Sequence, residues 1–470
     1  MGCTKNRSKI SVKYITLLLF SFLIVLPHQV WAALASQFSL SVGEQYSDNI
    51  FFSKNKQSDF VTVFTPTVSL YYAPTGVAAP TLNLNISPSA RIYADHRELN
   101  SFGFTDGGSI GGGYSYQYSP RLTFNFSESF QRQGQSRLLS GIDNANQTPL
   151  TPTTPFAIAT PLPATASQNL NNFVSRGDQL SNAFAFQGNL QVRPDLSFTG
   201  GYSNTFSKFI SAGGTDLSQT FSLRGVYNWK QEHNLHAGYS VSVSQSRNGS
   251  NGLIHNIDFG DDYFTSQVYK IELTPTLSLA ASTGLSINTS GSGPKIANNS
   301  TVTVTKLWET ASLSGGLRKG LTPSFGVSGV SDTTALFANF GIQLAERLSG
   351  SATTDFSFFD TQDVRFKTFQ ASLGLQYVFT SWLSSSLSYS YRMIDTVAGA
   401  NRTDGFLSQG VVSGSNVFLN FTTRFDLWPN TGLARTQPFS SGSPVLRTPF
   451  PSTAAPTSSP SGQPPTSGVN

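Results

Sequence analysis

The chain is dominated by short segments in which apolar and polar residues alternate, with turn-forming residues between them. In the segment 382–393, Leu383, Leu387 and Tyr389 share one parity, while serines and Arg392 occupy the other. Successive side chains of a β-strand point to opposite faces, so such a segment forms a strand with one apolar and one polar side. The pattern indicates sheets that separate two different environments.

The spacing of the turns narrows the architecture further. Leucines that follow a turn recur at intervals of 39, 42, 36, 35 and 35 residues, at Leu196, Leu235, Leu277, Leu313, Leu348 and Leu383. Each interval accommodates two strands, one short turn and one longer loop. A hairpin meander with this rhythm is best buried as a closed barrel, which has one face in lipid and one in water.

The N-terminus has the three-part layout of a secretory signal peptide. Basic residues without acidic ones precede an apolar run at 15–27, and small residues follow at 30–32 and 33–35; the basic residues are Lys5, Arg7, Lys9 and Lys13. A membrane anchor helix is the alternative, but the run is shorter than the roughly 20 residues that a span needs. We predict that 1–35 is a signal peptide.

The composition of the remaining chain excludes several classes of protein. Removing the four basic residues of the signal from the 30 Lys and Arg leaves 26 against 25 acidic residues, so nucleic acid is not an expected partner. The only cysteine, Cys3, lies in the signal, which excludes a disulfide framework. Charged residues make up 12% of the chain, against roughly 25% in soluble domains. This favours a wall that faces lipid.

Counting the alternating segments predicts an all-β, transmembrane, antiparallel up-and-down β-barrel of about 18 strands at 36–428. Sixteen strands are the alternative, because the segments 300–307 and 310–318 are short. The predicted strands span 37–48, 60–72, 81–94, 108–118, 121–132, 180–192, 196–208, 217–229, 234–246, 259–273, 276–288, 300–307, 310–318, 333–345, 348–359, 364–379, 382–393 and 413–427.

The predicted connections alternate between short turns and longer links, which is typical of outer-membrane barrels with their long loops outside the cell. The longest loop, 133–179, is rich in proline and cannot join a sheet interior. It either folds into the pore or stands outside as a lid. The tail 429–470 is rich in Pro, Ser, Thr and Gly and is predicted to be disordered.

Residues near the predicted first loop resemble a known family. The stretch 45–51 (QYSDNIF), followed by 58–62 (SDFVT) and a strand that contains Pro66, is similar to the opening of the β-barrel porin family of Gram-negative outer membranes. Its members often have Tyr-Asp-Asp-Asn there, and Ser47 replaces the first Asp. The turn 274–277 (TPTL) also resembles this family. The resemblance implies a β-barrel porin that is associated with exopolysaccharide export.

Residues suited to catalysis or metal binding are few, and we predict no enzyme, no metal and no cofactor. Four histidines remain after the signal, and Asp95 and His96, as strand neighbours, would point to opposite faces; the histidines are His96, His233, His236 and His255. Asp258, Asp261 and Asp262 are interpreted as a solvated rim near an outer loop. A calcium site is the alternative, although their spacing is not that of a calcium loop.

The polar faces carry the functional prediction. They hold mostly Ser, Thr, Asn, Gln and Gly, with sparse charges that we predict to line the pore: Arg91, Arg224, Asp355, Arg392, Arg424 and Asp426. Fixed charge on a channel wall sets ion preference, so four arginines against two aspartates predict weak anion preference. A plugged lumen, in which these groups pair with one another, is the alternative. Glu128 falls on the apolar face, so it lies above the hydrocarbon or the strand frame slips there.

These observations predict a porin-like channel in the bacterial outer membrane that assists exopolysaccharide secretion. A surface adhesin or scaffold that acts through the loops 133–179 and 394–412 is the main rival, and an enzyme at the rim is a third hypothesis. The expected partners are outer-membrane lipid and lipopolysaccharide, small solutes or polysaccharide in the lumen, and the barrel-assembly machinery.

Overall fold

The computed structural model describes residues 34–72, 80–104, 107–133, 179–210, 213–230, 233–245, 251–264, 277–289, 295–323, 330–360, 365–398 and 410–428. The predicted signal peptide up to residue 33, nearly all of the predicted loop 133–179 and the predicted tail from residue 429 lie outside these ranges. Among the described residues, no helix is long and apolar enough to cross a membrane.

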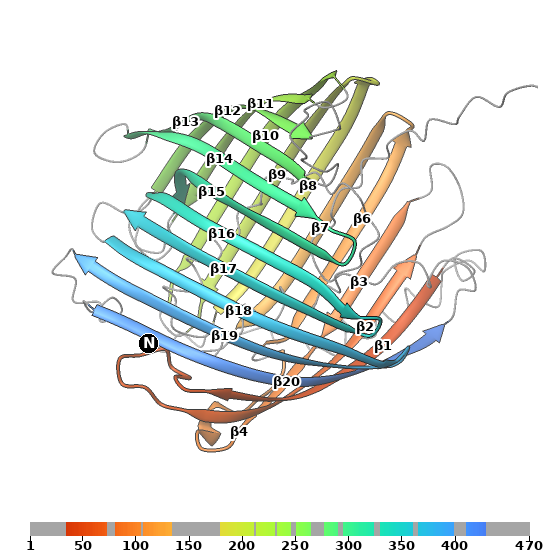
Figure 1. The fold of residues 1–470 in the computed structure, drawn as a ribbon, viewed down its shortest axis with the longest axis vertical. Helices are drawn as coiled ribbons and strands as arrows, with labels where there is room; N and C mark the ends of the chain where they lie inside the picture. Colours follow the sequence, from red (N-terminus) through yellow and green to blue (C-terminus); the bar gives the residue numbers. More distant parts are fainter. Residues whose placement is uncertain are drawn as a thin grey trace, which may run out of the picture.

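The described residues form strands and one short 3-10 helix, η1 (Figure 1). The first half of the chain contributes β1 (Leu34–Ser47), β2 (Asp59–Tyr72), β3 (Thr81–Ser87), β4 (Ser89–Tyr93), η1 (Arg97–Leu99), β5 (Ser101–Gly103), β6 (Ser109–Ser119), β7 (Leu122–Gln133), β8 (Gln179–Arg193), β9 (Leu196–Phe209) and β10 (Thr215–Lys230). The second half contributes β11 (His233–Gln245), β12 (Asn251–Phe264), β13 (Leu277–Asn288), β14 (Lys295–Leu307), β15 (Ala311–Pro323), β16 (Val330–Ala345), β17 (Leu348–Asp360), β18 (Arg365–Thr380), β19 (Leu383–Ala398) and β20 (Gly410–Trp428).

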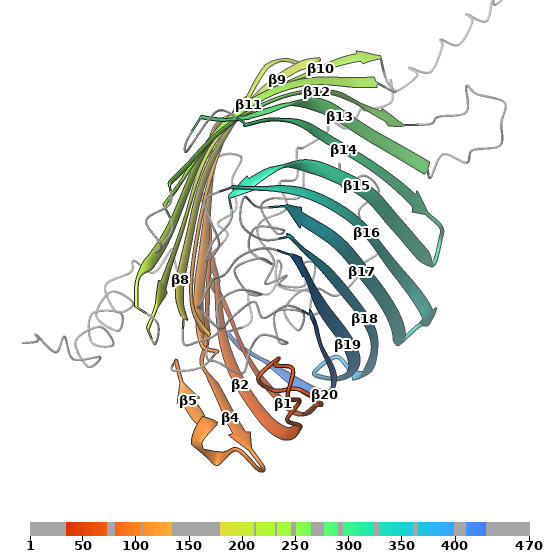
Figure 2. The same cartoon turned by 90° about the vertical axis from the view of Figure 1, so that its left-hand side faces the viewer.

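These strands form one antiparallel sheet that closes on itself, because β1 pairs with both β2 and β20. β3 and β4 continue one another along β2, on either side of Pro88. The short β5 pairs with β4, and the two project from one end of the barrel (Figure 2). The wall built by the described residues therefore has 18 strands, which confirms the predicted closed antiparallel barrel.

The outer face of the wall is apolar. Leu373 and Leu375 of β18 pair with Tyr389 and Leu387 of β19, and these four outward side chains are 42–57% exposed. Serines of the opposite parity point inwards. A closed barrel satisfies its backbone hydrogen bonds within the wall, and an apolar exterior is stable only in lipid. The chain is an outer-membrane β-barrel.

The lengths of the connections orient the barrel. At one end, β6–β7, β8–β9, β16–β17 and β18–β19 are joined by two residues each, and the chain termini of the wall lie at this same end. At the other end lie the connections 48–58, 134–178 and 399–409. Short turns face the periplasm in such barrels, so the end with the long connections is extracellular.

Several strands extend further towards the extracellular end than the alternation predicted. β14, β15 and β16 span Lys295–Leu307, Ala311–Pro323 and Val330–Ala345, whereas 300–307, 310–318 and 333–345 were predicted. The backbone ladder continues to the edge of the apolar belt and beyond it, where polar residues such as Asn298 and Lys319 occupy the outer face. Apolar alternation therefore reports the embedded part of a strand and not its full length.

One predicted strand begins earlier than expected. The span 259–273 was predicted, and β12 is Asn251–Phe264, so the predicted loop 247–258 is a strand from residue 251 onwards, while 265–273 lie outside the described residues. His255 and Asp261 interrupt the outward face, and Ile254 lies on the inward face, which blurred the alternation. Asp258 and Asp261 consequently lie within the wall and not at an outer rim.

The position of Glu128 is settled by the register. Glu128 of β7 points outwards, and its Oε1 accepts a hydrogen bond from Asn182 Nδ2 at 3.0 Å. The same outward row continues through Phe184 and Asn204 to Gln219. The strand frame therefore does not slip. The next outward row towards the extracellular end holds Phe130, Phe206 and Leu217, so Glu128 lies within the apolar belt and is compensated there by its hydrogen bond to Asn182.

Candidate functional site

The inner face of the wall carries the charged residues that the sequence singled out. Arg91 lies on β4, Arg224 on β10, Asp355 on β17, Arg392 on β19, and Arg424 with Asp426 on β20. Their sequence neighbours Ile92, Leu223 and Phe425 are exposed on the outer face. Because side chains alternate along a strand, all six charged side chains point towards the lumen.

The register brings some of these six side chains together and leaves others apart. Asp355 pairs with Gln370, and Gln370 pairs with Arg392, so the two charges share one row across three strands. Asp426 accepts a hydrogen bond from Gln37 Nε2 at 3.2 Å, two residues from Arg424. Arg91 and Arg224 belong to strands that are not neighbours of this group. The six residues do not form one ring.

Arg392 is covered by the connection between β1 and β2, the turn 48–58. The Arg392 guanidinium lies 6.0 Å from the ring centroid of Phe52, which is within cation–π range. Arg392 and Phe52 are each 3% exposed. The turn thus folds over the inner wall of β19 and β20, and shields this arginine from the lumen.

Asn49 fixes the conformation of this turn. Its Nδ2 donates to the carbonyl oxygens of Ser53 at 2.7 Å and Ser413 at 2.9 Å, and its Oδ1 accepts from the N–H of Ser53 at 3.0 Å. Asn49 is completely buried. These bonds hold Phe52 at a φ of 45°, a left-handed conformation that costs energy in a residue other than glycine. The stretch 45–51, which resembles the porin family, therefore leads into a turn that is fixed by specific hydrogen bonds.

Asp48 and Lys56 complete the turn. The Asp48 N–H donates to the Ser415 carbonyl oxygen at 3.1 Å, and the Asp48 carboxylate accepts from the N–H of Ser415, which extends the β1–β20 ladder. The same carboxylate forms an ion pair with Lys56 at 3.1 Å. The turn is thus anchored to the wall at its first residues.

A second anchored element adjoins the turn at the extracellular rim. Asp59 is the first residue of β2, at the extracellular end of the wall, beside the connection that contains Asp95 and His96. Its carboxylate accepts hydrogen bonds from the N–H groups of Asp95 and His96 at 3.1 and 3.0 Å, and lies 2.8 Å from His96 Nδ1. Burial alone would raise the pKa of Asp59, but these hydrogen bonds lower it below its ordinary value.

On β11 and β12, Gly238 and Gly260 leave space on the inner face beside Asp258, which had been predicted to lie at an outer rim. Arg224 pairs with Gly238, and Gly238 pairs with Asp258. A Cβ at Gly238 would lie 2.5 Å from an Asp258 carboxylate oxygen, so the carboxylate extends over β11 towards the strand of Arg224. The His236 ring lies over Gly260 in the same way, with Nε2 3.8 Å from Asp258 Oδ2.

Arg318 was also missed. It points inwards from β15 and interacts electrostatically with Asp355 on β17. The predicted strand ended at residue 318, so Arg318 was treated as a strand end. The alternation of Leu313 and Leu317 on the outer face gave the signal that could have placed it on the inner face.

The histidines of the described residues pair with single polar groups. His233 Nδ1 lies 2.6 Å from Asp261 Oδ2, and His255 Nδ1 lies 2.8 Å from the Tyr239 hydroxyl, both on the outer face. Over the described ranges, no three histidine, cysteine or acidic side chains gather in a way that could hold a metal ion. The inner face offers a charged, hydrogen-bonding wall.

In comparisons with known proteins, no family model and no curated protein matches this chain in sequence. Solved barrels are similar in structure at low identity. Acinetobacter baumannii OccAB4 matches with a TM-score of 0.46 and 12% identity, over 85% of this chain and 100% of that chain. Pseudomonas aeruginosa OccK2 (OpdF) matches with a TM-score of 0.45 and 10% identity, over 84% and 98%. Pseudomonas aeruginosa OpdL matches with a TM-score of 0.45 and 12% identity, over 84% and 100%.

Proposed function

We propose that this protein is a porin-like channel of the outer membrane. The observation that carries the proposal is the contrast between the two faces of the wall, which is apolar outside and lined inside by hydroxyl, amide and sparse charged groups. Barrels of roughly 16 to 18 strands leave an aqueous interior. A polar inner wall is stable because water fills that interior.

The distribution of exposure supports a path past the turn 48–58. The turn covers Arg392, whereas Arg224, Arg318 and Asp355 on other strands are only half-buried. Part of the charged wall therefore contacts solvent in the lumen. Conduction requires no reaction and no bound group, because the width and lining of the lumen determine which solutes pass.

Conductance in planar bilayers tests the proposal. The only cysteine of the sequence, Cys3, lies in the predicted signal peptide, which makes single-cysteine variants straightforward. We expect Ser386→Cys, on the inner face of β19, to lose current when a bulky water-soluble thiol reagent is added. Leu387→Cys is the matched control on the lipid side of the same strand. A silent bilayer, or equal block of both variants, contradicts the channel.

We further propose that the solute is a polysaccharide on its way out of the cell. The support is the resemblance of residues 45–51 to exopolysaccharide-associated porins, together with a lining of hydroxyl and amide groups that exchange hydrogen bonds with sugars as readily as with water. Neutral oligosaccharides added to the periplasmic side should interrupt the current. An anionic small solute that permeates freely while oligosaccharides leave the current unchanged would restrict the channel to small solutes.

A surface adhesin or scaffold is the second candidate. The observation that favours it is the projecting element β4–η1–β5, which the Asp59 carboxylate holds at the extracellular rim (Figure 2). Together with the predicted loop 133–179 and the connection 399–409, this element would form the contact surface. A protein that supports cell attachment but conducts no ions would favour this candidate over the channel.

A further inference from the structure

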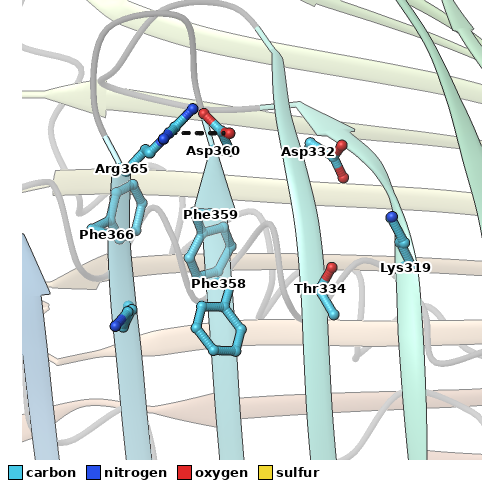
Figure 3. Close-up of a pocket in the computed structure, with 9 residues that line it drawn as sticks. Lys319, Asp332, Thr334, Phe358, Phe359, Asp360, Arg365 and Phe366 are labelled. Atoms are coloured by element: carbon cyan, nitrogen blue, oxygen red, sulfur yellow. Dashed lines mark ion pairs between the residues drawn. The ribbon is translucent and has the colours of Figure 1, made fainter. Parts of the chain in front are cut away.

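A pocket of about 420 Å³ lies where β15, β16, β17 and β18 reach the extracellular end (Figure 3). Basic, acidic, hydroxyl and aromatic side chains line it, for example Lys319, Asp332, Thr334 and Phe358. The channel proposed above uses none of these side chains, because they belong to the other face of the wall.

The register places two rows of this pocket on the outer face, and one of them holds both lysines. Lys319 pairs with Thr334, Thr334 with Phe358, and Phe358 with Lys367, across four strands. The residues that precede or follow them in sequence, Arg318 among them, point into the lumen. The two lysines therefore stand on the lipid side of the barrel, three strands apart, with a hydroxyl and an aromatic ring between them.

The adjacent rows fix the height of the two lysines in the membrane. The next outward row towards the periplasm is entirely apolar and runs through Leu317, Leu336, Phe356 and Phe369. The next outward row towards the cell exterior holds Asp332, Asp360 and Arg365. The lysine row thus lies at the upper edge of the apolar belt, where aromatic side chains meet lipid headgroups.

The charges of the pocket favour an anion. Arg365 is neutralised by Asp360, whose carboxylate lies 3.2 Å from the guanidinium. Lys367 Nζ lies 5.9 Å from the centroid of the Phe358 ring. Within the described part of the chain, neither Lys319 nor Lys367 forms an ion pair. Two ammonium groups therefore face the headgroup layer. Asp332, which Figure 3 shows on the strand beside Lys319, is the only other charged group lining this pocket that is not already paired within it.

We propose that this pocket binds the phosphate group of a phosphorylated glycolipid in the outer leaflet of the membrane. Lys319 and Lys367 donate charge-assisted hydrogen bonds to the phosphate oxygens, and the Thr334 hydroxyl adds a third donor. The Phe358 ring packs against the apolar part of the same lipid. A lipid, and not free phosphate, is the occupant because the donors stand on the lipid side at headgroup height.

The test compares lipid retention by the full barrel and two variants. The barrel is reconstituted with lipopolysaccharide, extracted in mild detergent and examined by native mass spectrometry for bound lipid. We expect Lys319→Gln with Lys367→Gln to weaken lipopolysaccharide binding by about tenfold or more, since two charge-assisted bonds are lost. Lys208→Gln is the matched control, because Lys208 points outwards near the extracellular end of β9 on another side of the barrel.

Two further measurements separate the possible failures. Enzymatically dephosphorylated lipopolysaccharide should bind the wild type as weakly as intact lipopolysaccharide binds the double variant, and inorganic phosphate should not compete at millimolar concentration. The site is overturned if the wild type and the double variant retain lipopolysaccharide equally. The double variant must be folded in this test, as judged by a change of its SDS-gel mobility on heating. Effective competition by inorganic phosphate overturns the choice of a lipid. Conductance of the double variant should stay unchanged, so this result is independent of the channel.

Discussion

Arg392 and Arg224 both point into the barrel, yet they occupy opposite settings. Arg392 is 3% exposed beneath Phe52, on a part of the wall that the turn 48–58 covers. Arg224 is half-buried beside Gly238, over which the Asp258 carboxylate extends. The comparison teaches that a position on the inner face is not sufficient for a role in conduction. A lumen charge acts on passing ions only if solvent reaches it.

The same comparison separates two uses of a charged side chain. At Arg392 an aromatic ring and a buried turn are organised around the guanidinium, so its charge supports a local structure. At Arg224 the absence of side chains at Gly238 and Gly260 makes room for the polar groups of Asp258 and His236. We therefore expect changes at the first site to alter the turn, and changes at the second to alter the field in the lumen.

Releasing the turn should have the largest effect. Asn49→Ala removes three side-chain hydrogen bonds from a buried position, which should cost the closed turn about 2–4 kcal/mol. Lys54 and Lys56 in this turn are exposed and become cleavable once the turn opens. Trypsin should cut the variant at these lysines at least tenfold faster than the wild type, as read from SDS gels of the folded barrel.

Asn55→Ala is the control for this experiment, because Asn55 lies in the same turn but is exposed. Its cleavage rate should match that of the wild type. If Asn49→Ala is cut no faster, the turn does not depend on Asn49, and the shielding of Arg392 needs another explanation.

Removing the accessible arginine should change ion selectivity by a smaller amount. Arg224→Ser should lower the anion-to-cation permeability ratio by about twofold, since fixed charge near a low-dielectric wall attracts counter-ions. Arg392→Ser should change this ratio less while the turn is closed. Reversal potentials across a salt gradient measure both, and the difference should fade at high salt.

Combining variants sharpens this prediction. In the Asn49→Ala background Arg392 becomes accessible, so Arg392→Ser should then lower the permeability ratio about as much as Arg224→Ser does. Equal effects of the two arginine variants in the wild-type background would show that burial does not decide which charges act on ions.

Much of the barrel could be predicted from the sequence because lipid imposes a simple rule on each strand. In β19 every outward residue from Leu387 to Tyr391 is apolar, and the predicted strand 382–393 differs from Leu383–Ala398 mainly at its outer end. The rule stops at the membrane surface. Above it the backbone ladder continues with polar outward residues, so strand ends and the true position of β12 could not be read from alternation.

The candidate site was less predictable, for a physical reason that Arg392 illustrates. Alternation assigns a residue to the inner face, but whether a side chain is covered depends on which distant segment folds over it. Phe52 reaches Arg392 from 340 positions earlier in the chain. The row that joins Asp355 to Arg392, and the approach of Asp258 to Arg224, depend on strand register, which one-residue periodicity does not specify.

The smallest effect concerns acid and the extracellular rim. Burial raises the pKa of the Asp59 carboxyl, but hydrogen bonds from the N–H groups of Asp95 and His96 outweigh this effect. The pKa is therefore lowered in the folded barrel. Because the folded pKa lies below the ordinary value of 3.8, Asp59 stabilises the rim element above that pH. This stabilisation should be lost as the pH falls through the folded pKa.

Hydrogen exchange at the amides of Asp95 and His96, corrected for the intrinsic effect of pH, measures this loss. Protection of both amides in the wild type should decline below about pH 4, while amides in the middle of β19 keep theirs. Asp59→Asn removes the titrating group, so its protection should be weaker at neutral pH and should not change further in acid. Such a result assigns the acid sensitivity of the rim to this single carboxylate. Protection in the wild type that stays constant down to pH 3 would show instead that the hydrogen bonds to Asp59 do not hold β4–η1–β5 in place.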